Sequence, residues 1–125
     1  MSIILDEVYQ MLVKELNDVP DENIFKYTID EGFHEQTDDP IVRIVQLPSY
    51  PDQYADDTQI SHVYDIQIDI FWAQKEPFFI GELIKMLMRM KSFKQTYEEP
   101  LYDEETRTFR SIRRYTGAFI LEEEL

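Results

Sequence analysis

The sequence predicts an α+β domain in which two helices pack on one face of a mostly antiparallel sheet, in the order α-β-β-β-α-β-β. Two segments repeat apolar residues every three or four positions, which is the helical period. Three β-rich segments lie between them and two more follow. The 125 residues suit a single domain spanning 1–125, and the 43% hydrophobic content suits a folded core.

The first helix is predicted over Ile4 to Leu16, where apolar residues recur at helical spacing before Asn17 and Asp18. A short strand is predicted over Ile24 to Ile29 because this segment is β-rich and ends in acidic residues. A second strand is predicted over Ile41 to Leu47. Prolines flank this run on both sides and therefore set its limits.

A polar loop is predicted over Pro48 to Thr58, followed by the clearest strand, Tyr64 to Trp72. This strand alternates apolar and polar residues, so one face enters the core and the other meets solvent or a partner. The second helix is predicted over Pro77 to Lys91, since proline suits a first turn and a broad apolar face follows. The core face of the strand comprises Tyr64, Ile66, Ile68, Ile70 and Trp72, and the opposite face comprises Asp65, Gln67 and Asp69.

The last part of the chain predicts a strand at Phe93 to Tyr97, a connection at Pro100 to Glu105 and a long strand at Thr106 to Leu121. Apolar residues of the long strand fall on both parities. We therefore expect a bulge near Gly117, which would shift the alternation by one residue.

The net charge of −14 is unevenly distributed. Residues 1–84 contain 18 acidic and 4 basic side chains, whereas residues 85–125 contain eight of each. Such a surface repels duplex DNA and anionic membranes, so we expect no specific nucleic-acid binding and no membrane binding. The charge is consistent with ordinary solubility, a basic protein partner, imitation of nucleic acid, or a wall past which nucleic acid slides.

Catalytic and metal sites are not predicted, so we expect no enzyme and no cofactor. The three glycines are too far apart for a phosphate loop or a dinucleotide fingerprint, and the chain has no cysteine. The two histidines fit no zinc motif or nucleophilic triad. Asp52, Asp56 and Asp57 lack the glycine turn and the final glutamate of a calcium loop.

Two surfaces are candidates for protein contacts. Arg107, Arg110, Arg113 and Arg114 cluster on the last predicted strand, where they could form internal salt bridges or meet the acidic region of a neighbouring copy. We expect Arg113 and Arg114 to lie outside the core. The polar loop is the other candidate. Its interface residues are Tyr50, Asp52, Tyr54, Asp56 and Asp57. The methionines of the second helix suit either core packing or burial in an oligomer.

The layout resembles the tail-terminator or tail-completion proteins of long-tailed bacteriophages. The resemblance rests on the order of elements, the proline-bounded strand Ile41 to Leu47, the alternating strand and the final Arg-Arg-Tyr-Thr-Gly-Ala-Phe-Ile. It implies a structural virion protein, assembled in the bacterial cytoplasm, that forms a hexameric ring, caps the tail tube and joins the head to the tail. It also implies contacts with itself, the major tail-tube protein and the head connector proteins, and it places Asp65, Gln67 and Asp69 toward the lumen or solvent.

Two alternatives come from other classes. Type III secretion chaperones are also small, acidic, dimeric α+β proteins, but they usually end in a further helix, whereas here the last predicted strand is followed by three glutamates and a leucine. An acidic inhibitor that imitates DNA would use the same net charge to occupy a nucleic-acid channel.

Overall fold

The computed structural model describes the backbone of residues 3–48, 50–55, 58–74 and 76–120, and the side chains of residues 4–48, 62–74 and 76–119. It confirms the α+β class, with two helices and a mixed, mostly antiparallel sheet. The helices are α1 (Ile3–Glu15) and α2 (Phe78–Met90), and they match the predicted segments closely. Ser2, a possible cap for α1, lies outside the described residues.

The main sheet has the strand order β1-β2-β4-β6-β5. Its strands are β1 (Ile24–Lys26), β2 (Ile41–Gln46), β4 (Thr58–Trp72), β5 (Lys94–Asp103) and β6 (Thr108–Ile120). The β1–β2 pair is parallel and the other pairs are antiparallel. Strand β1 is shorter than predicted, because Tyr27 adopts a left-handed backbone conformation with φ 68° and turns the chain away from the sheet.

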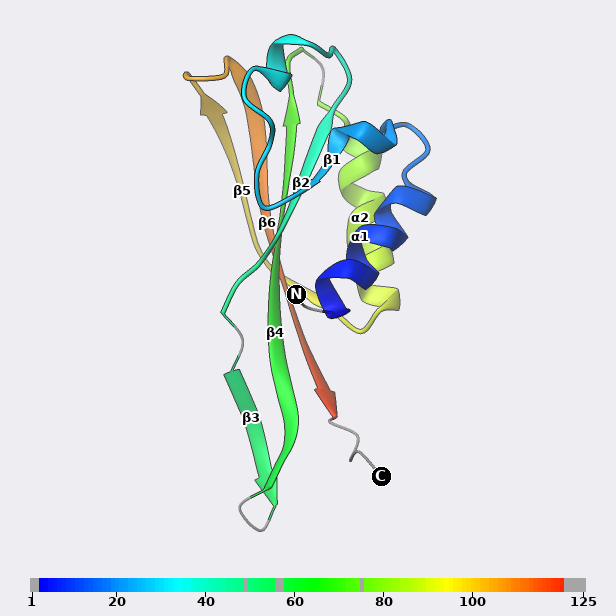
Figure 1. Ribbon diagram of the computed structural model, residues 1–125, viewed down its shortest axis with the longest axis vertical. Coiled ribbons are helices and arrows are strands. Elements are labelled where there is room, and N and C mark those ends of the chain that lie inside the picture. The colour runs from blue at the N-terminus through cyan, green and yellow to red at the C-terminus, as the bar shows by residue number, and fades with distance from the viewer. Residues whose placement is uncertain (1–2, 49, 56–57, 75, 121–125) are drawn as a thin grey trace.

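Both helices cover one face of the sheet, as Figure 1 shows. α1 contacts β1 and β2, α2 contacts β5, and the helices touch each other. Between them and the sheet lies the hydrophobic core, which includes Val8 and Leu12 of α1 and Ile84 and Met88 of α2. The predicted alternation of β4 is confirmed, since Ile66, Ile68 and Ile70 are buried in this core and Tyr64 and Trp72 pack against it.

The segment predicted as a loop over Pro48 to Thr58 contains strand β3 (Tyr50–Ala55), so that prediction is wrong. β3 pairs with the N-terminal part of β4, and Tyr50 lies opposite Val63. β4 therefore starts six residues earlier than predicted. In Figure 1, β3 and the start of β4 form an arm that extends away from the helices. The polar composition hid this strand, because a two-stranded ribbon outside the core needs no alternating apolar face.

The C-terminal strands also differ from the prediction. β5 continues through Pro100, where we expected a connection. β5 pairs with β6 on one side, and proline is tolerated on an edge strand because it lacks only one ladder donor. The predicted bulge near Gly117 is absent from the β4–β6 register, which is continuous. The register shift lies in β5, between Gln95 and Tyr97.

Apolar residues of β6 point to both faces of the sheet, because other segments of the chain pack against each face. The segment between β1 and β2 folds over the face opposite the helices, where the rings of His34 and Phe71 are 5.0 Å apart. Phe71 is buried on that face, and so is Ile112 of β6. Gly117 needs no bulge either. A Cβ there would lie 3.0 Å from the Phe93 ring, so a close aromatic approach explains this glycine.

Candidate interaction surfaces

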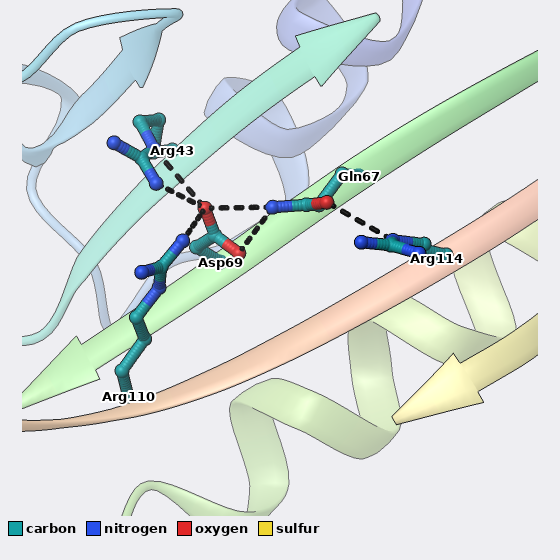
Figure 2. Close-up of polar contacts among 5 residues, drawn as sticks. All are labelled: Arg43, Gln67, Asp69, Arg110 and Arg114. Carbon is teal, nitrogen blue, oxygen red and sulfur yellow. Dashed lines mark hydrogen bonds and ion pairs between the residues drawn. The ribbon is translucent and has the colours of Figure 1, made fainter. Parts of the chain in front are cut away.

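The face of β4 opposite the helices carries a buried ion network centred on Asp69 (Figure 2). Arg43 of β2 donates two hydrogen bonds to Asp69 Oδ2, from Nη2 at 2.6 Å and from Nε at 3.1 Å. Arg110 of β6 donates a third to the same oxygen at 3.1 Å. Because β2 and β6 flank β4, the sheet register brings both guanidinium groups to one carboxylate.

Asp69 is 0% exposed, so the prediction that it faces solvent or a lumen is wrong. A strand pattern cannot show this, since it depends on side chains that reach across from neighbouring strands. Asp65 and Gln67 are half-buried on the same face. Gln67 donates to Asp69 Oδ1 at 3.1 Å, and Asp65 accepts a hydrogen bond of 2.6 Å from the Thr116 hydroxyl.

Arg113 lies on the opposite face of the sheet, toward the helices. Its side chain donates to the carbonyl of Gly81 in α2, to Ser111 Oγ and to Glu98 Oε2, each at 3.1 Å. Arg113 is 7% exposed, so the expectation that it lies outside the core is wrong. The glycine in α2 belongs to the same arrangement, because a Cβ at Gly81 would lie 2.8 Å from the Arg113 Cζ.

Of the three predicted interface arginines, Arg114 alone is exposed. It donates to Gln67 Oε1 at 3.1 Å, and its guanidinium lies 4.9 Å from the centre of the Tyr97 ring. A hydrogen bond from Tyr97 to the Glu99 carboxylate raises the pKa of that phenol. For Arg110 and Arg113 the structure favours the internal ion pairs that we considered as an alternative to an intersubunit contact.

A pocket of about 460 Å³ opens between the segment that follows β1 and the β5–β6 turn. Arg43, Arg110 and Phe71 line it, together with His34. Burial lowers the pKa of His34, and Arg43 adds to this, whereas Asp103 opposes it. Five residues that line it carry carboxylates, and we call this pocket the acidic pocket. They are Asp30, Glu31, Glu35, Asp103 and Glu105.

The outer side of α2 combines exposed apolar side chains with unpaired cations. Phe79 is 84% exposed, Met90 74% and Met86 52%, whereas Met88 is buried in the core. Three cations lie together along the C-terminal half of α2 and the start of β5, and they form no ion pair within the described part of the chain. We call them the basic cluster, namely Lys85, Arg89 and Lys94.

The predicted loop contacts fall mostly beyond what the structure describes. Tyr50, Asp52 and Tyr54 belong to β3 by their backbone, but their side chains are outside the described set. Asp56 and Asp57 lie outside the described residues altogether. The arm is therefore placed as a backbone ribbon. Its role as an interface remains a prediction.

No protein-family model and no curated protein matches the chain. Within the described residues, no group of three or more histidine, aspartate or glutamate side chains is arranged to hold a metal ion. The two helices there have 13 residues each, and neither is long and apolar enough to cross a membrane.

Sequence reasoning missed the acidic pocket and the basic cluster. The pocket joins residues about 70 positions apart, and no local pattern signals such a meeting. The cluster did leave a signal, because Lys85 and Arg89 are four residues apart within a helix and therefore lie on the same side of it. That signal was masked by the arginines of β6, which are closer together in sequence.

Proposed function

We propose that this chain is a non-enzymatic structural protein of a bacteriophage virion that forms an oligomeric ring, caps the tail tube and contributes to the head-tail joint. The arm carries the proposal. Its β3 strand pairs with β4 alone among the described strands, and the arm extends beyond the helices (Figure 1). β6 pairs with β4 only as far as Ser61, so beyond this point the tip of the arm is a two-stranded ribbon. Such a ribbon is marginally stable in water, so a neighbouring surface would stabilise it.

The outer side of α2 supports the same proposal. Phe79 and Met90 are more than 70% exposed in the single chain, and Phe78 is 65% exposed. Exposed apolar side chains gathered on one element commonly mark a protein contact, whereas scattered ones carry no such meaning. A subunit that buries this side of α2 against a neighbour would remove these side chains from water.

The charge of the chain suits a ring through which DNA passes. The net charge of −14 means that phosphates would be repelled by much of the subunit surface. DNA could then move through the ring without being held. The cations Arg43, Arg110 and Arg113 are already bound to carboxylates of the same chain, so they add little attraction for phosphate.

The test is the solution mass of the purified protein by light scattering across a concentration series, with electron microscopy of the assembled species. We expect a ring, hexameric in the particle, in equilibrium with the single subunit. A protein that stays monomeric at every concentration would contradict the proposal. A stable dimer would instead favour the secretion-chaperone alternative.

A matched variant isolates the arm. Residues 52–61 are replaced by an Asn-Gly turn, which leaves Tyr50 opposite Val63 and keeps β2, β6 and both helices unchanged. We expect this variant to keep the thermal stability of the body and to lose ring formation. Rings that form as readily as those of the unaltered chain would show that the arm is not the contact.

A further inference from the structure

We propose that the basic cluster of one copy binds the acidic pocket of the next copy, so that the ring closes through a head-to-tail contact of opposite charges. This inference rests on the proposed ring. It replaces Arg110 and Arg113 as the basic half of the contact, because both are already bound to carboxylates of their own chain.

The first step is that these charges are available. In the described part of the chain, Lys85, Arg89 and Lys94 form no ion pair, although the whole chain has 26 acidic and 12 basic side chains. Around the acidic pocket, Arg43 and Arg110 are occupied by Asp69. The five carboxylates of the pocket therefore have no cation among the described residues with which they form an ion pair.

The second step is that one copy cannot satisfy both surfaces. The basic cluster lies where β5 begins and the acidic pocket where β5 ends. Nine residue steps along a strand span about 30 Å. The Debye length at physiological ionic strength is about 8 Å, so the two surfaces scarcely attract each other within one chain. A second copy can present its acidic pocket directly to the cluster.

The third step is that apolar surface accompanies the charge on both sides. Met86 and Met90 are exposed beside the basic cluster on α2. Leu101, Tyr102 and Phe109 are exposed near the β5–β6 turn. Burial of these side chains would supply the free energy that exposed ion pairs lack, while the charges set the register and the rate of association.

The fourth step is that β5 is a poor alternative contact. Its outer edge is free among the described strands, but Pro100 and the register shift before Tyr97 interrupt it. Contact between two different surfaces, in contrast, is the geometry that closes rings.

The test uses two full-length charge-reversed variants. One carries Arg89→Glu and Lys94→Glu, and the other carries Glu35→Lys and Glu105→Lys, two carboxylates of the acidic pocket. All four side chains are exposed, so both variants should fold, as circular dichroism melting would verify. Asp103 is left unchanged because its carboxylate accepts hydrogen bonds from the backbone of residues 105 and 106.

We expect each variant alone to associate at least tenfold more weakly than the unaltered chain in sedimentation or light scattering. An equimolar mixture should recover association, because the reversed basic cluster of the first variant then faces the reversed acidic pocket of the second. Association of the unaltered chain should weaken between 0.1 and 1 M salt.

Three results would overturn the inference. The first is a variant that assembles as the unaltered chain does, and the second is a mixture that stays as weakly associated as its parts. Both outcomes leave the proposed ring standing. If the unaltered chain itself stays monomeric, the proposed ring fails first, and the head-to-tail contact fails with it.

Discussion

Asp69 shows how one side chain links three strands. Its carboxylate accepts hydrogen bonds from Arg43 of β2 and Arg110 of β6, and it is itself on β4. The two arginines are 24% and 22% exposed, and they separate the carboxylate from water. A buried carboxylate with two guanidinium partners is costly to break, because removal of one member leaves the others partly desolvated without a counter-ion.

Replacement of Asp69 should therefore destabilise the protein. We expect Asp69→Asn to lower the free energy of unfolding by about 3 kcal/mol. The matched control is Asp65→Asn on the same strand face, where a single hydroxyl partner limits the loss to about 1 kcal/mol. Urea unfolding measures both. Equal losses at the two positions would contradict a special role for the Asp69 network.

Tyr115 makes stability depend on pH in the alkaline range. Burial raises the pKa of its phenol to about 12, from an ordinary value of 10.0. Between these values the unfolded chain releases the proton while the folded chain keeps it, so the folded state binds more protons. Stability therefore falls as pH rises from 10 toward 12, by up to about 1.4 kcal/mol per pH unit.

The measurement is urea unfolding at pH 9, 10 and 11, with Tyr115→Phe as the comparison. The phenylalanine variant should lose part of this pH dependence, because the raised phenol is gone. A variant whose stability falls as steeply as that of the unaltered chain would assign the effect to other groups.

The two faces of β4 differ in what covers them. Toward the helices, Ile68 contributes to a continuous apolar core. On the other face, Gln67 takes part in a polar chain that runs from Asp69 to Arg114. Both faces of the sheet are covered at β4. The strand therefore places apolar side chains on the face toward the helices and hydrogen-bonded polar side chains on the opposite face.

We expect Ile68→Ala to cost about 2–5 kcal/mol, since it opens a cavity beneath both helices. Gln67→Ala should cost less than about 1 kcal/mol, because Asp69 keeps its hydrogen bonds from both arginines and the exposed Arg114 can turn to water. Both losses in the free energy of unfolding follow from the midpoints of denaturant unfolding curves, when the slopes of the curves are equal. Similar losses at the two positions would overturn the assignment of faces.

At the scale of the whole molecule, two neighbouring arginines of β6 allow the fold and the assembly to be tested separately. Arg113 holds α2 to the sheet through the Gly81 carbonyl, whereas Arg114 lies on the outer face. Arg113→Glu would put a carboxylate beside Glu98 in a nearly closed space, and we expect it to cost about 3–5 kcal/mol or prevent folding. Arg114→Glu should leave the subunit folded and, under the head-to-tail contact, still able to assemble.

Circular dichroism melting reports the fold and light scattering reports the assembly of both variants. An Arg114→Glu subunit that folds but no longer assembles would return the basic half of the contact to β6. A stable, folded Arg113→Glu subunit would show that the guanidinium is dispensable for the packing of α2.

The sequence by itself determined both helices, the core face of β4 and the α+β class, because each depends on a local period that a single segment carries. It could not find β3, whose pairing with β4 is set by the extended hairpin and not by an apolar face. The burial of Asp69 and Arg113, the acidic pocket and the isolation of the basic cluster were decided by tertiary structure. Each depends on side chains that come from distant segments and meet across the sheet. A local sequence pattern cannot predict which charged side chains form ion pairs with one another.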